Sequence, residues 1–163
     1  MSYAKYITHL NLKYDADELK DEVEDLNFEP NYKYTRGYND SEDDAWWLAR
    51  IRGNIHMYPY IEDLYKLLEA DFIAIHMQYA NTRVNTHIDP NSLCCVNILL
   101  SGDTGPVIFE DYGKIYYKCA LFNNQEWHAV PSYNKERLLL KFAYSKRSYE
   151  KVLTTLTNKG LVS

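Results

Sequence analysis

Short apolar runs separated by turn-forming residues fill the second half of the chain and limit its fold most strongly. The runs are residues 72–80, 93–100, 106–110, 114–122 and 137–144, and Gly, Asn, Asp and Pro stand between them. Runs of this length, rich in branched and aromatic residues, are typical of β-strands. Their close spacing indicates antiparallel strands in a sandwich or jelly roll. The sequence therefore predicts a mainly β fold.

Amphipathic segments flank this series, so the predicted class is α+β with helices packed on a sheet. Residues 15–26 and 60–68 each place apolar side chains at helical spacing, and a third short helix is expected after Ser145. A chain of 163 residues is long enough to bury one core without disulfides. We expect a single domain over 1–163, with a helical buttress and candidate substrate lid at 1–71, a jelly-roll core at 72–144 and a C-terminal helix or tail at 145–163.

The region between the two predicted helices allows two interpretations. Residues 31–40 combine aromatic and basic side chains and could form a substrate lid, because binding residues concentrate on loops. Trp46 and Trp47 begin an apolar stretch that favours an ordinary strand instead. We expect His9, His56 and His76 to be structural.

Charge and cysteine content exclude some classes of protein. A net charge of −5 argues against a reader of duplex nucleic acid, which needs a basic surface. Three cysteines, Cys94, Cys95 and Cys119, provide no even disulfide framework. No leader and no apolar run long enough to cross a membrane is apparent. We therefore expect a cytoplasmic protein without a membrane partner.

Three side chains far apart in the sequence are candidate metal ligands: His87, Asp89 and His128. Residues two apart on a strand share a face, so His87 and Asp89 can bind one ion together, and His128 must arrive from a later strand. Two histidines and one carboxylate hold non-haem Fe(II) and leave neighbouring coordination positions open. The alternatives are a turn that begins at Asp89 and a half-buried His128 beside Trp127.

Arg137, at the start of the predicted strand 137–144, is a candidate for binding an anion. One side of this strand carries apolar residues, and the other carries Arg137, Leu139 and Lys141. A guanidinium that faces the interior needs an anion, and its planar fork fits a carboxylate. The alternative is an ordinary ion pair with a nearby acidic residue.

At these positions the chain resembles the Fe(II)- and 2-oxoglutarate-dependent oxygenases. Their pattern is His-x-Asp, a long spacer, a distal His and then Arg or Lys on the next strand, and here 41 positions separate His87 from His128. The resemblance spans roughly residues 72–144. Residues 105–109 are similar to the family's Gly-Gly-x-x-x-Phe turn and strand, and residues 121–124 lead to the distal histidine.

The resemblance implies a double-stranded β-helix, which is a cupin-like jelly roll, with Fe(II) bound by the three candidate ligands. It implies that 2-oxoglutarate chelates the iron, that Arg137 holds its far carboxylate, and that O2 takes the last position, with ascorbate as a supporting reductant. The implied reaction hydroxylates an unactivated C–H bond and releases succinate and CO2.

The chain departs from the family pattern around the co-substrate. Leu139 stands where many relatives have Ser or Thr, and the strand after His-x-Asp lacks the tyrosine of prolyl hydroxylases. Tyr79 and Asn97 are therefore candidate co-substrate residues. Tyr79 could equally be a core aromatic residue, and Asn97 could satisfy backbone groups. Lys141 is the fallback partner for the carboxylate.

Two branches of the family fit the chain: prolyl 4-hydroxylase-like proteins and aspartyl/asparaginyl β-hydroxylase-like proteins, with compact phage-encoded members among the latter. For a phage-encoded chain, the expected location is the host cytoplasm. We expect an amino-acid residue in a protein or peptide as substrate, slightly ahead of a free amino acid or small metabolite. A Zn-dependent cupin-type enzyme and a non-catalytic jelly roll stay open as other classes.

Overall fold

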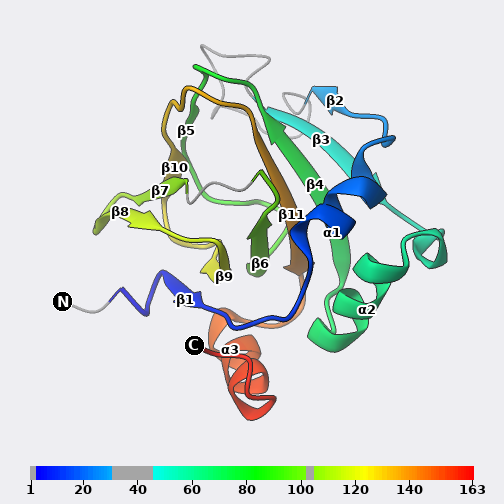
Figure 1. The fold of residues 1–163 in the computed structure, drawn as a ribbon. Coiled ribbons are helices and arrows are strands. Elements are labelled where there is room, and N and C mark those ends of the chain that lie inside the picture. Colours follow the sequence, from blue (N-terminus) through cyan, green and yellow to red (C-terminus); the bar gives the residue numbers. More distant parts are fainter. Residues whose placement is uncertain (1–2, 31–45, 102–104) are drawn as a thin grey trace.

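Two antiparallel sheets face each other, and helices cover the outer face of the larger sheet (Figure 1). The structure is a computed structural model, and it describes residues 3–30, 46–101 and 105–163. The candidate lid at residues 31–40 lies outside the described residues. The mainly β fold with flanking helices predicted from the sequence is confirmed.

The larger sheet has seven strands in the order β1-β9-β6-β11-β4-β3-β2, and the smaller has four in the order β5-β10-β7-β8. The strands of the larger sheet are β1 (Ile7–His9), β2 (Glu29–Pro30), β3 (Trp46–Ile51), β4 (Phe72–Gln78), β6 (Cys94–Leu99), β9 (Cys119–Asn123) and β11 (Arg137–Tyr144). Those of the smaller sheet are β5 (Val84–His87), β7 (Pro106–Phe109), β8 (Gly113–Tyr116) and β10 (His128–Val130). Strands distant in sequence thus lie side by side, as in a jelly roll.

Four of the five predicted strands are confirmed as β4, β6, β7 and β11. The prediction of one strand over 114–122 is wrong, because this run divides into β8 and β9. Strand β8 pairs with β7 in the smaller sheet, and β9 pairs with β6 in the larger. The chain crosses from one sheet to the other between Tyr116 and Cys119.

Three α-helices form where the amphipathic patterns predict them: α1 (Ala16–Val23), α2 (Pro59–Leu68) and α3 (Tyr149–Asn158), with the short 3-10 helix η2 (Ile55–Met57) before α2. The side chain of Asp15 accepts hydrogen bonds from the backbone N–H groups of Asp17 and Glu18, which caps α1. None of the helices in the described ranges is long and apolar enough to cross a membrane.

The first 71 residues contribute strands as well as helices. Strand β3 pairs with β4 along its whole length, so the interpretation of Trp46 and Trp47 as part of an ordinary strand is confirmed. Strands β1 and β2 extend the larger sheet at its two edges. This region is therefore more than a helical buttress.

The apolar core has two layers, one on each face of the larger sheet. On the helix side, Leu140 and Phe142 of β11 pack with Leu19 of α1 and Ile61 of α2. Between the two sheets, Leu139 of β11 belongs to a second cluster, which also contains residues of β7 and β9. The alternation of side chains along β11 therefore divides the strand as predicted, and the face with Arg137 is directed at the smaller sheet.

Candidate metal centre

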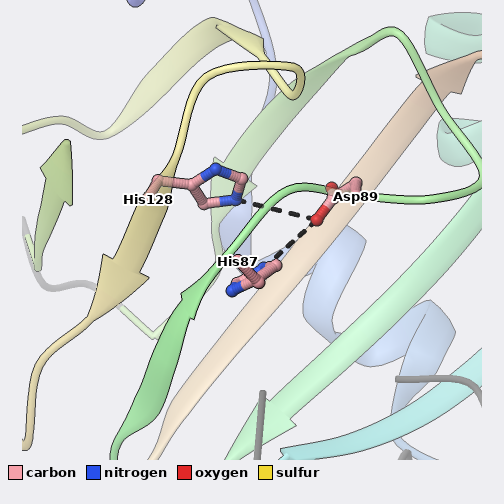
Figure 2. Close-up of side chains that lie close together, drawn as sticks. All are labelled: His87, Asp89 and His128. Carbon is pink, nitrogen blue, oxygen red and sulfur yellow. Dashed lines mark ion pairs between the residues drawn. The ribbon is translucent and has the colours of Figure 1, made fainter. Parts of the chain in front are cut away.

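His87, Asp89 and His128 converge on one point between the two sheets (Figure 2). Oδ1 of Asp89 lies 3.2 Å from Nε2 of His87 and 3.7 Å from Nε2 of His128. One ligand atom from each residue lies within 4.8 Å of the others. Metal–ligand bonds of about 2.1 Å to N and O atoms place neighbouring ligand atoms about 3 Å apart. The three side chains are therefore spaced to share one ion.

Pairing within the smaller sheet brings the two histidines together. His87 ends β5, His128 begins β10, and the two residues lie directly opposite each other in the ladder. Their ring centroids are 4.4 Å apart. A later strand thus brings His128 to His87, as the spacing in the sequence required.

Asp89 does not lie on the same strand as His87, and that expectation is corrected. Strand β5 ends at His87, two residues before Asp89. Instead, the backbone N–H of Asp89 donates to the carbonyl of Asn124 at 3.1 Å. The side chain of Gln125 donates to the carbonyl of Asp89 at 3.4 Å. The segment before β10 therefore positions the carboxylate.

Backbone carbonyls fix the orientation of both imidazole rings. Nδ1 of His87 lies 2.7 Å from the carbonyl oxygen of Asn85, and Nδ1 of His128 lies 2.8 Å from that of Glu126. A carbonyl oxygen only accepts hydrogen bonds, so each Nδ1 carries a proton, and in the neutral form of each ring the lone pair is on Nε2. Two lone pairs and a carboxylate oxygen thus point at a common position, and this arrangement attracts a cation.

Burial and charge put His128 and Asp89 in the protonation states that metals require. Burial lowers the pKa of His128 to about 4, so this ring is neutral at neutral pH. Burial disfavours the ionised form of Asp89, but the Lys141 ammonium outweighs it and holds the pKa of this carboxyl well below its usual range. Metal binding needs neutral imidazole and ionised carboxylate ligands, and His128 and Asp89 are in these states.

A cavity opens from this site between the sheets, and Arg137 lies in its wall. The Arg137 side chain is only 5% exposed, its Nη1 donates to the carbonyl of Pro106 at 3.4 Å, and its Cζ lies 4.4 Å from the centroid of the Tyr133 ring. The guanidinium therefore has a fixed place in the same cavity as the three ligands.

The two candidate co-substrate residues have different positions. Asn97 lines the cavity and is buried, and it lies opposite Lys141 in the pairing of β6 with β11. Tyr79 is not among the described residues that line the cavity; the residue is 37% exposed and its ring packs edge-on against that of Trp47. The alternation along β4 explains the difference, because Gln78 faces the cavity and its neighbour Tyr79 points away.

Two residues of the cavity have positions that differ from the sequence interpretation. Nζ of Lys141, the fallback partner for the co-substrate carboxylate, lies 3.2 Å from Oδ2 of Asp89, beside the candidate metal ligands. His76, expected to be structural, lines the cavity and packs on Trp46 with ring centroids 4.7 Å apart. Burial lowers the pKa of His76 well below its ordinary value, so the ring is neutral. Because side chains alternate along a strand, Phe72, His76 and Gln78 lie on the same face of β4, and this alternation could have predicted that His76 faces the cavity.

Comparison of the sequence with models of protein families and with curated proteins gives no match. Similar solved structures do exist. A 2OG-Fe(II) oxygenase family oxidoreductase from Burkholderia pseudomallei is 15% identical with a TM-score of 0.62, and the alignment covers 85% of each chain.

Two prolyl hydroxylases have similar structures. The viral collagen prolyl hydroxylase of Paramecium Bursaria Chlorella virus-1, solved with 2OG, is 11% identical with a TM-score of 0.56 and coverage of 86% of this chain and 97% of the other. A prolyl-4-hydroxylase from Pseudomonas putida is 15% identical with a TM-score of 0.52 and coverage of 86% and 94%. The chain therefore has the double-stranded β-helix fold of these oxygenases, which confirms the fold predicted from the sequence.

Proposed function

We propose that this chain is an Fe(II)- and 2-oxoglutarate-dependent dioxygenase. We also propose that residues 1–163 form a single domain. The enzyme hydroxylates an unactivated C–H bond and releases succinate and CO2. One observation carries the proposal: Nε2 of His87, Nε2 of His128 and Oδ1 of Asp89 converge in a cavity that also contains a buried guanidinium. A metal site explains the three ligand atoms, and a dicarboxylate co-substrate explains Arg137.

The donor set fits ferrous iron. Two histidines and one carboxylate form a facial triad, which leaves three positions of an octahedron for a bidentate co-substrate and O2. The bound iron would supply the oxidising chemistry, and the protein supplies the geometry of the site. A reducing compartment keeps iron ferrous, so we propose a cytoplasmic location.

Arg137 is the residue that would hold the far carboxylate of 2-oxoglutarate. Its side chain is buried, so a hydrogen-bonded ion pair there is screened little by water. The Pro106 carbonyl and the Tyr133 ring hold the guanidinium in place before any ligand arrives. A planar guanidinium held in this way can bind a carboxylate through two hydrogen bonds.

Apolar side chains form much of the remaining wall and limit the access of water. Leu99 of β6, Val107 of β7 and Phe122 of β9 line the cavity from both sheets. All three are buried. Exclusion of water protects reactive species from side reactions and strengthens the electrostatic contacts inside the cavity.

The proposed substrate is an amino-acid residue in a protein or peptide. Two of the similar structures are prolyl hydroxylases, one of them named for collagen, and this supports a peptide-like substrate. A free amino acid or small metabolite is the second candidate. A Zn-dependent cupin-type enzyme would use the same ligands, but it gives no reason for the buried Arg137.

The test is formation of succinate from 2-oxoglutarate by the purified protein, with and without added Fe(II). Turnover that requires Fe(II) and is lost in His87→Ala and Asp89→Ala supports the proposal. Succinate formation without metal, or hydrolysis that requires Zn, would overturn it. Mass spectrometry of cell extract, searched for products that have gained one oxygen atom, then identifies the substrate.

A further inference from the structure

The two carboxylate oxygens of Asp89 have different neighbours. Oδ1 lies 3.2 Å from Nε2 of His87 and 3.7 Å from Nε2 of His128. Oδ2 lies 3.2 Å from Nζ of Lys141, which donates a hydrogen bond to it. Figure 2 shows both histidine contacts meeting at a single oxygen. One oxygen is therefore directed at the metal position, and the other is held by an ammonium group.

The strand ladder of the larger sheet fixes the base of Lys141. Lys141 lies near the middle of β11, opposite Asn97 of β6 on one side and Ala74 of β4 on the other. Its side chain crosses the space between the sheets to reach Asp89, which follows β5 of the smaller sheet. The side chains of Lys141 and Asp89 are 13% and 14% exposed, so water screens their attraction little.

The main chain alone does not determine which oxygen of Asp89 reaches the metal. Asn124 and Gln125 hold the backbone of Asp89, but the carboxylate can still rotate about its last bond. A carboxylate binds a metal through one oxygen or through both, and the second mode takes an additional coordination position. A partner that holds one oxygen therefore decides how many positions stay open.

We propose that Lys141 is a positioning residue that restricts Asp89 to binding the metal through Oδ1 alone. The inference rests on the proposed metal site and goes beyond it, because it assigns a role to a lysine that is not a ligand. With Oδ2 held by Lys141, the three protein ligands occupy three positions and leave three open. Partners of metal ligands commonly have this orienting effect.

The experiment is structure determination of the full chain loaded with Mn(II), which is stable in air, for the wild type and for Lys141→Met. Methionine keeps most of the length of the lysine side chain and removes its charge and its donors. Lys114→Met is the matched control, because Lys114 is exposed on β8. Lys141→Gln serves as a second variant, since it keeps a neutral donor and guards against a folding failure of Lys141→Met.

We expect one Asp89 oxygen on Mn(II) in the wild type and in Lys114→Met, with Nζ of Lys141 still on Oδ2. In Lys141→Met we expect both oxygens within about 2.2 Å of the metal. We also expect the dissociation constant of 2-oxoglutarate for the Mn(II)-loaded variant to rise about tenfold, because one position is lost.

Two results would overturn the inference and leave the metal site intact. One is that Lys141 turns away from Asp89 when Mn(II) binds. The other is that Asp89 binds Mn(II) in the same way in the wild type, Lys141→Met and Lys141→Gln. Failure of the wild type to bind Mn(II) at all would instead remove the proposed function together with the inference, so the two failures are distinguishable.

Discussion

Gly105 and Arg137 approach each other so closely that no side chain fits between them. A β-carbon added to Gly105 would lie 2.5 Å from Cζ and 2.7 Å from Nε of Arg137. Non-bonded carbon atoms normally keep about 3.5 Å or more. The absence of a side chain at position 105 therefore allows the guanidinium its observed place in the cavity wall.

Gly105→Ala should raise the 2-oxoglutarate concentration that the proposed oxygenase requires. The added methyl group displaces the guanidinium, and a tenfold rise in KM corresponds to a loss of about 1.4 kcal/mol. The free energy of unfolding should change little, because the displaced group is the end of a long side chain. Steady-state kinetics and urea unfolding measure the two quantities. In an Arg137→Ala background the same change should have no further effect, and a further effect there would contradict the explanation.

Loss of any of the three ligands should abolish metal binding as well as turnover. His87→Ala, Asp89→Ala and His128→Ala each leave two donors, which hold a divalent ion too weakly for a defined site. Metal content after gel filtration and succinate formation measure both effects. His9→Ala is the control, because His9 contacts the hydroxyl of Tyr3 away from the cavity. A ligand variant that keeps full metal content would argue against this site.

The metal-free protein should lose stability as the pH falls below about 6.5, and His128 should cause part of that loss. A histidine in the unfolded chain takes up a proton near pH 6.5, whereas folded His128 does so only at about 4. Between these values the unfolded state binds more protons, so acid favours unfolding.

Replacement of His128 by Gln removes this titration. The drop in the free energy of unfolding between pH 7 and pH 5 should be about 2 kcal/mol smaller in His128→Gln than in the wild type. Urea unfolding in the presence of a chelator measures the difference. Equal pH dependence of the two proteins would show that the pKa of His128 is not lowered on folding.

Glu22→Gln should destabilise the helical layer behind the larger sheet. The carboxylate of Glu22, on α1, accepts hydrogen bonds from the backbone N–H groups of Tyr60 at 2.7 Å and Ile61 at 3.0 Å, at the start of α2. A carboxylate at a helix N-terminus satisfies free donors and favours the helix dipole, so its loss should cost about 1 kcal/mol. Thermal unfolding tests this value. The same substitution at exposed Glu24 should have little effect.

The pattern of alternating side chains predicted much of the cavity from the sequence. On β11 it separated Arg137 and Lys141 from Leu140 and Phe142, and on β6 it placed Asn97 toward the cavity. These predictions succeeded because a strand with two different faces allows a single orientation. The same rule, applied to β4, would also have placed His76 in the cavity wall.

Other features depend on contacts that no short sequence pattern contains. Asp89 owes its position to the carbonyl of Asn124, and Lys141 reaches Asp89 from the opposite sheet. The division of residues 114–122 depends on which partner strand each half meets. Tyr79 was chosen by its distance from His87 in the sequence, whereas its side of β4 directs it away from the cavity. In each of these cases, contacts between segments that are distant in the sequence determine where the residue or strand lies.

The site draws its parts from both sheets: the two histidines belong to the smaller sheet, and Arg137 and Lys141 belong to the larger. A bound ion with a dicarboxylate would therefore contact residues of both sheets at once and connect them. Ligands that bind only the folded state raise its stability by an amount that grows with the logarithm of the ligand concentration once this exceeds the dissociation constant. Binding of the ion and the dicarboxylate should therefore raise the unfolding temperature of both sheets together, in a single transition.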